Sequence, residues 1–175
     1  MIKSEIELSA YSEQSPHLKA GVRVYALTWG YDEKPSAKFF REYTRKEGFL
    51  GVVALHHGEV VGIAFGVKSV PGNWWHDMVS RHIGEHHAAL KDAWVLVEIA
   101  ILPSYRNQGI GQQMIDYLGS RQPYANMLLS TQTTNTGARR LYERLGWSYL
   151  HQGIQFYPDN YTRFVIMHRP RELKL

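Results

Sequence analysis

The chain has 175 residues, of which 44% are hydrophobic and 21% are charged, and this composition is typical of one globular domain with its own core. It has no cysteine, which excludes disulfides, thiolate metal sites and cysteine nucleophiles and fits a cytoplasmic protein without requiring one. The net charge of +4 favours anionic ligands, but no dense Lys/Arg block indicates nucleic acid, and neither a membrane span nor a secretory signal is expected.

The residue pattern predicts the elements in chain order. A first strand is expected over 2–11, followed by helices at about 15–29 and about 36–46 and by a hairpin over 49–69 that turns at His56–Glu59. A Trp- and His-rich segment at 71–92 precedes a strong buried strand at 93–102. A helix from Ile110, a strand at 125–131, a helix closed by Gly146 and two antiparallel strands at 147–157 and 161–170 complete the chain. No repeat or linker interrupts it, so residues 1–175 are expected to form one domain.

A basic, glycine-containing turn follows the strand at 93–102. Arg106, Gly109 and Gly111 lie directly before or within the start of the next helix, whose first N–H groups have no partner inside it and whose dipole attracts anions. Such a turn suits a phosphate. It is not a P-loop, which needs Gly-Lys-Ser/Thr, nor a dinucleotide fingerprint, which needs a glycine where Met114 stands. The alternative is a turn that only starts a helix.

Two motifs together resemble the GNAT superfamily of acetyl-CoA-dependent N-acetyltransferases. Arg106, Gly109 and Gly111 match its acyl-CoA motif: Arg or Gln, two variable residues, Gly, one variable residue, then Gly or Ala. About 30 residues further on, a second motif is matched by Asn135, Ala138, Tyr142 and Gly146, with Trp147 where Phe is commoner. The resemblance implies a mixed α/β fold with a mostly antiparallel sheet of about six or seven strands, splayed at the fourth and fifth and flanked by about four helices.

The resemblance also implies acetyl-CoA as cosubstrate. The pyrophosphate is expected on the turn formed by Arg106, Asn107, Gln108, Gly109, Ile110 and Gly111. The backbone at Ile99 and Ile101 is expected to pair with the pantetheine arm. Asn135, which on its own predicts a helix N-cap, is implied to bond the same arm.

The implied reaction is acetyl transfer to a primary amine of a small molecule or peptide, by direct attack in a ternary complex. An alkyl amine has a pKa of about 10, so a base must remove a proton at neutral pH. Glu98 is the only charge in its strand, and apolar surroundings would raise its pKa, which suits that base; the alternative is a structural glutamate at a strand edge or beside an arginine. Tyr142 is implied to protonate the departing thiolate, and simple core packing is its alternative.

The segment at 71–92 is expected as an insertion between the third and fourth strands. Trp74, Trp75 and His76 could line the acceptor side there, with a hydrophobic plug or a dimer contact as alternatives. Further along, His82, Glu85 and His86 match the H-x-x-E-H zinc-hydrolase pattern, but Gly84 weakens that helix. We therefore expect a partly exposed helix and no metal. A non-catalytic acyl-CoA-binding module is the other alternative; the acceptor's identity and a homodimer are left open.

Overall fold

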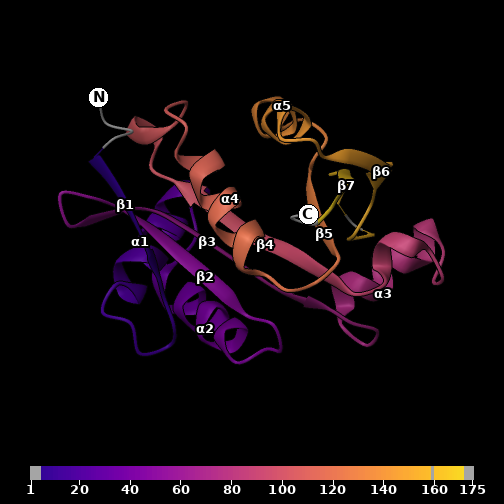
Figure 1. Cartoon of the computed structure of the whole chain (residues 1–175), viewed down its shortest axis with the longest axis horizontal. Coiled ribbons are helices and arrows are strands. Elements are labelled where there is room, and N and C mark those ends of the chain that lie inside the picture. Colours follow the sequence, from indigo (N-terminus) through magenta and orange to yellow (C-terminus); the bar gives the residue numbers. More distant parts are fainter. Residues whose placement is uncertain (1–4, 159, 172–175) are drawn as a thin grey trace. The chain divides into compact units, whose positions relative to one another are not determined.

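The computed structural model describes residues 5–158 and 160–171, and Figure 1 shows the order of their elements. The helices are α1 (Leu18–Trp29), α2 (Glu33–Thr44), α3 (Trp74–Ile83), α4 (Ile110–Arg121) and α5 (Thr136–Arg144). The strands are β1 (Ile6–Ala10), β2 (Leu50–His56), β3 (Glu59–Ser69), β4 (Ala93–Ile101), β5 (Asn126–Gln132), β6 (Ser148–Ile154) and β7 (Phe164–Pro170).

The predicted helices and strands are present with shifted ends. The helix expected at about 36–46 covers Glu33–Thr44, because Pro35 fits a first helical turn, where its missing N–H costs little. The strand expected at 2–11 is described from Ile6 to Ala10, and residues 2–4 of that prediction lie outside the described residues. Five α-helices occur in the described ranges where about four were expected, because part of the Trp- and His-rich segment is helical.

The strands hydrogen-bond in the order β1-β2-β3-β4-β5-β7-β6. The pairs β1–β2, β2–β3, β5–β7 and β6–β7 are antiparallel, whereas β4 and β5 are parallel. The parallel register runs from the Ala93–Asn126 pair to the Leu96–Leu129 pair, so it covers only the first four residues of each strand. This seven-stranded, mostly antiparallel sheet, with its short parallel pairing where the splay was expected, confirms the predicted fold class.

The chain divides into two compact units. The first unit is Met1–Val67 with Val97–Gln122, and the second unit is Lys68–Leu96 with Pro123–Leu175. The boundary passes through β4, whose residues 93–96 belong to the second unit and whose residues 97–101 belong to the first. The single domain over 1–175, with an insertion at 71–92, stays a prediction.

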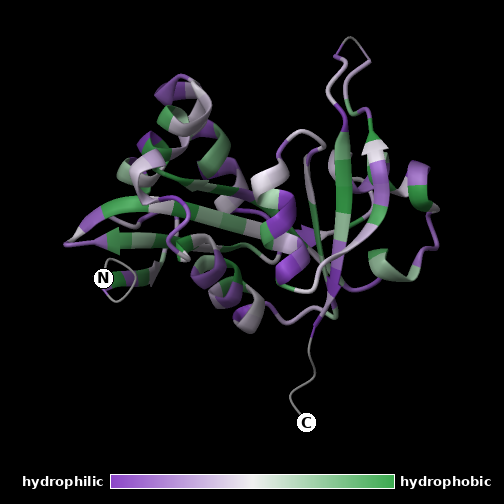
Figure 2. Cartoon of the chain, turned by 90° about the horizontal axis from the view of Figure 1, so that it is seen from above, coloured by the Kyte–Doolittle hydropathy of each residue, from purple (hydrophilic) through white to green (hydrophobic). Residues whose placement is uncertain are grey.

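The first unit has helices on both faces of its strands (Figure 1). On one face, α1 approaches β3 so closely that a Cβ at Gly21 would lie 2.5 Å from Cδ1 of Ile63. Phe40 of α2 packs edge-on against Phe65 on the same face, with ring centroids 5.0 Å apart. On the other face, a Cβ at Gly62 would lie 3.2 Å from Sδ of Met114 in α4. The strands are largely hydrophobic in Figure 2, whereas the helices mix both residue classes, as amphipathic elements do.

In the second unit, α3 ends before the H-x-x-E-H pattern is complete. Gly84 has φ +101°, a conformation that stops the helix at Ile83. His82 therefore lies in the last turn, with Nδ1 2.8 Å from the carbonyl oxygen of Met78, whereas Glu85 and His86 follow the helix. The spacing of four residues on one helical face that a zinc hydrolase needs is not formed. The prediction of a partly exposed helix is confirmed for His82, which is exposed in the last turn of α3.

Among the described residues, no helix is both long and apolar enough to span a bilayer.

Candidate functional site

The turn between β4 and α4 has the backbone shape of an anion site. The chain leaves β4 through an amide of Leu102 that donates to the carbonyl of Val61 at 2.9 Å, and a short 3-10 helix follows at Pro103–Tyr105. Asn107 and Gly109 then take positive φ values of +59° and +81°. Gly109 is the N-cap of α4, and no side chain caps the helix. The amides at the start of α4 are thus presented without a side-chain acceptor, as a phosphate site requires.

Two side chains of the turn hold its shape. Arg106 Nε donates to the carbonyl oxygen of Ile101 at 3.1 Å, and Gln108 Nε2 donates to that of Ser104 at 3.0 Å. Both bonds fold an exposed or half-buried polar side chain back onto the segment that leads out of β4. Arg106 therefore positions the turn as well as adding positive charge beside it.

Glu98 lies on β4 only a few residues before this turn. Its side chain is half-buried, and desolvation raises the pKa of its carboxyl from 4.5 to about 8. In the described part of the chain no hydrogen bond or ion pair to this carboxylate is formed, so the alternative of an arginine partner finds no support there. The ionised Glu98 carboxylate interacts electrostatically with Tyr25 of α1 and, after burial, contributes to the raised pKa of that phenol. A carboxyl with a pKa near 8 can accept a proton at neutral to mildly basic pH.

Tyr142 lies in the last turns of α5, in the second unit. The helix closes as the second motif predicts: Gly146 has φ +84°, its amide donates to Glu143, and the amide of Trp147 donates to the carbonyl of Tyr142. These two bonds form a Schellman motif. The rings of Tyr142 and Trp147 lie 5.8 Å apart, and both residues are buried. The packing that was the alternative for Tyr142 is thus present, and it also fixes the position of the ring.

The N-terminus of α5 shows the predicted cap. Asn135 Oδ1 accepts a hydrogen bond from the amide of Ala138 at 3.3 Å. Arg139, one turn on, donates from Nε to the hydroxyl of Tyr149 at 3.0 Å and from Nη1 to the carbonyl of Thr133 at 2.8 Å. These bonds tie α5 to β6 and to the loop after β5, so Arg139 has a structural role.

The three residues proposed for the acceptor side differ in exposure. Trp74 is 52% exposed and stacks on Tyr157, with ring centroids 5.5 Å apart. Trp75 donates from Nε1 to the Ser130 hydroxyl at 3.0 Å. His76 is buried, with Nδ1 2.9 Å from the hydroxyl of Ser69, and burial lowers its pKa. Trp74 is therefore the most exposed of the three, and Trp75 is half-buried.

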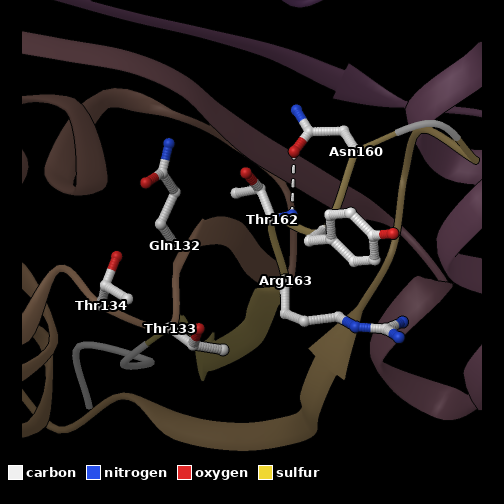
Figure 3. Close-up of a pocket in the computed structure, with 7 residues that line it drawn as sticks. Gln132, Thr133, Thr134, Asn160, Thr162 and Arg163 are labelled. Carbon is white, nitrogen blue, oxygen red and sulfur yellow. Dashed lines mark hydrogen bonds between the residues drawn. The ribbon is translucent and has the colours of Figure 1, made fainter.

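A polar pocket in the second unit was not predicted from the sequence (Figure 3). Its volume is about 390 Å³, and its lining comes from the end of β5 and the segment before β7: Gln132, Thr133, Thr134, Asn160, Tyr161, Thr162 and Arg163. The amide of Thr133 donates to the carbonyl of Arg163 at 2.9 Å, and Asn160 Oδ1 accepts from the amide of Thr162 at 2.9 Å. The two segments lie about 30 residues apart, and neither carries a motif that would have joined them.

The structure brings the first-unit candidates together along one continuous stretch. Glu98, Ile99 and Ile101 lie on β4, and the turn at 106–111 follows directly. The second-unit candidates are placed separately: Asn135 and Tyr142 on α5, and residues 74–76 at the start of α3.

Comparisons with known proteins agree on one family. The family model described as Acetyltransferase (GNAT) family matches residues 21–147. The GCN5-like protein acetyltransferase of Mycobacterium tuberculosis is 31% identical over 115 residues, which are 60% of this chain and 56% of that protein, so the match spans little more than half of the relative's length.

Solved structures show the same fold. An aminoglycoside 6'-N-acetyltransferase complexed with coenzyme A superposes with TM-score 0.68 at 17% identity, over 97% of this chain and 99% of that one. The ribosomal-protein-S18-alanine N-acetyltransferase of Escherichia coli superposes with TM-score 0.65 at 22% identity, over 95% and 96% of the two chains.

Proposed function

This chain belongs to the GNAT acetyltransferase family, and on that premise we propose that it transfers the acetyl group of acetyl-CoA to a primary amine. The observation that carries the proposal is Glu98, a carboxyl with a pKa of about 8 on the strand that leads into an uncapped helix N-terminus. A proton acceptor and an anion site on one short stretch are what amine acetylation from a pyrophosphate-bearing donor requires.

Acetyl-CoA supplies an activated thioester, whose carbonyl carbon is attacked by the amine nitrogen as the C–S bond breaks. Glu98 takes the proton that the amine loses, directly or through water. The Tyr142 hydroxyl gives a proton to the departing thiolate. Atoms and charges then balance without a covalent enzyme intermediate, in agreement with a chain that has no cysteine.

The donor's phosphates are held by the turn from Arg106 to Gly111, in our proposal, through backbone amides at Asn107, Gln108, Gly109, Ile110 and Gly111. Support comes from the positive φ values at Asn107 and Gly109, which curl the backbone around the uncapped start of α4. The backbone at Ile99 and Ile101 and the side chain of Asn135 would hold the pantetheine arm. One of the two strand amides would then polarise the acetyl carbonyl.

The acceptor is a primary amine on a small molecule or a peptide. Both kinds of acceptor occur in the names of similar proteins: one of these enzymes is named for an aminoglycoside, and another for an alanine of a ribosomal protein. In this chain, the exposed Trp74–Tyr157 stack offers a surface for an acceptor, because aromatic faces attract cationic groups. A homodimer stays a prediction.

The proposed function is tested by incubating the protein with acetyl-CoA and a panel of amines, including polyamines, amino acids, aminoglycosides and peptides with a free N-terminus. Free thiol is measured as it is released. We expect at least one amine class to raise the rate of thiol release well above that without an amine. Thiol release at the same rate with every amine and without any would contradict the proposal.

Replacing Tyr142 with phenylalanine tests the acid separately. The change removes only a hydroxyl, so the packing on Trp147 and the KM for acetyl-CoA should be nearly unchanged, whereas kcat should fall by about 10²–10⁴-fold if protonation of the thiolate limits the rate. Steady-state kinetics with acetyl-CoA as the varied substrate give both constants. Tyr117→Phe is the matched control and should keep the wild-type kcat, because this half-buried tyrosine of α4 packs against Arg121 and has no assigned role. A Tyr142→Phe enzyme with wild-type kcat would remove Tyr142 from the proton transfer.

A further inference from the structure

Three side chains of the kinds that can hold a metal ion gather at the β2–β3 turn of the first unit. Leu50–His56 and Glu59–Ser69 form a hairpin, whose two turn residues, His57 and Gly58, have φ +50° and +80°. Positive φ at both positions is typical of the tight turns that suit strand twist. This turn places His56 and His57 side by side, with ring centroids 4.1 Å apart.

The third member comes from the neighbouring strand. Ile6 of β1 pairs with His56 of β2, so Glu5, one residue earlier, lies beside the two histidines. Oε2 of Glu5 lies 3.0 Å from Nε2 of His56 and 3.6 Å from Nε2 of His57. The ligand atoms of the three residues all lie within 4.8 Å of one another.

These separations match those of a first-row metal site. Zinc bound at about 2.0–2.2 Å by imidazole nitrogen and carboxylate oxygen in a tetrahedron would hold its ligand atoms about 3.3–3.6 Å apart. The Glu5–His57 distance of 3.6 Å lies at the upper end of that range, and the Glu5–His56 distance of 3.0 Å lies a few tenths of an ångström below it. The two histidine nitrogens lie within 4.8 Å of each other, so side-chain rotation would have to bring them together. Imidazole and carboxylate together also suit zinc better than they suit magnesium or calcium.

A fourth side chain orients the central ligand. The Tyr105 hydroxyl lies 2.9 Å from Nδ1 of His56. Nε2–H of His56 donates to the Glu5 carboxylate, so Nδ1 accepts from the Tyr105 hydroxyl. A metal ion that replaces the Nε2 proton would leave Nδ1–H to donate to that hydroxyl. Metal-binding histidines usually have such a partner on their other nitrogen.

We infer that Glu5, His56 and His57 bind one divalent transition-metal ion of the zinc class, with water completing the coordination. The site does not take part in the proposed acetyl transfer, which uses no metal. Tyr105 ends the 3-10 helix at Pro103–Tyr105, so a bound ion would strengthen the contact between that short helix and the β2–β3 hairpin.

Calorimetric titration of untagged protein with Zn²⁺ tests the site, because a histidine tag would bind zinc itself. We expect about one equivalent to bind. His57→Asn and Glu5→Ala should each weaken binding at least tenfold; asparagine tolerates the positive φ of this turn, and both residues are exposed, so the fold should persist. Tyr105→Phe should weaken binding by about 10–100-fold, the usual effect of removing the hydrogen-bond partner on the other nitrogen of a metal-binding histidine.

The matched control is His86→Asn. Nε2 of His86 lies 3.3 Å from Oε1 of Glu85, and among the described residues this exposed pair is not part of a group of three possible ligands. The site is supported if His57→Asn, Glu5→Ala and Tyr105→Phe weaken zinc binding and His86→Asn leaves it unchanged. No heat of binding at zinc concentrations up to about 100 μM, or equal binding by all variants, would overturn it. Zinc should raise the melting temperature of the protein, and a chelator should reverse that rise. The rate of thiol release in the acetyl-transfer assay should be the same with and without the chelator.

Discussion

Replacing Glu98 with glutamine is expected to lower kcat/KM for the amine by about 10²–10⁴-fold below pH 8, the usual contribution of a positioned general base. Glutamine has nearly the same shape and cannot accept the proton. Because the described structure gives the carboxylate no ion-pair partner, the change removes no salt bridge, and the loss reports proton transfer.

The pH dependence identifies the group. Burial raises the pKa of Glu98 to about 8, so in the wild type the basic form grows as pH rises to 8 and kcat/KM should then level off. The variant depends on the amine that is already neutral, whose fraction grows until about pH 10. The ratio of wild-type to Glu98→Gln kcat/KM should therefore be constant below pH 8 and should fall between pH 8 and pH 10. Initial rates at saturating acetyl-CoA across pH 6–10 measure both curves.

Glu85→Gln is the control for this experiment. Glu85 is exposed, follows α3 and belongs to the H-x-x-E-H pattern, so it should keep wild-type rates if that pattern has no catalytic role. A Glu98→Gln enzyme with a pH profile parallel to wild type and a loss below about threefold would remove Glu98 from the mechanism.

Replacing Gly109 with valine is expected to abolish acetyl-CoA binding. Gly109 has φ +81°, where a β-branched residue is strained, and a side chain there would stand between the ligand and the first amides of α4. At 100 times its Kd, the ligand should stabilise the wild type by about 2.7 kcal/mol, which raises Tm by about 5–10 °C for a chain of this size. The variant should show no such rise.

Gly30→Val separates backbone strain from lost binding. Gly30 also has a left-handed φ, +70°, at the C-terminus of α1, and a Cβ there would meet nothing within 4 Å. Both variants should lose about 1–3 kcal/mol of stability from the strain. Only Gly109→Val should lose the rise in Tm with acetyl-CoA. An undiminished rise in a folded Gly109→Val protein would contradict the assignment of the phosphate turn.

The sequence predicted those features of the structure that depend on a single residue and its chain neighbours. Asn135 and Gly146 predicted the two ends of α5, since each has the chemistry of a helix cap, and the structure shows both caps. The lone charge of Glu98 in an apolar strand predicted a raised pKa, and burial produces one. His57 and Gly58 predicted the hairpin turn for the same local reason.

Features that depend on strand register were not accessible from the sequence. Glu5 meets His56 only because Ile6 pairs with that histidine across the β1–β2 ladder. The polar pocket needs Thr133 and Arg163, which are joined by one backbone hydrogen bond between distant segments. For His76 the sequence left an acceptor-side role and a hydrophobic plug open, because the partner that buries its ring, Ser69 at the end of β3, cannot be identified from local sequence.

Mass spectrometry of the complete reaction tests the central claim most directly. The protein, acetyl-CoA and the best amine of the panel are incubated together, and amine, acetylated amine, free CoA and intact protein are all quantified. The account predicts acetylated amine and free CoA in equal amounts, no mass added to the protein, and loss of both products in Glu98→Gln at pH 7. Free CoA without acetylated amine, or an acetylated protein that forms before the product does, would contradict direct transfer to an amine.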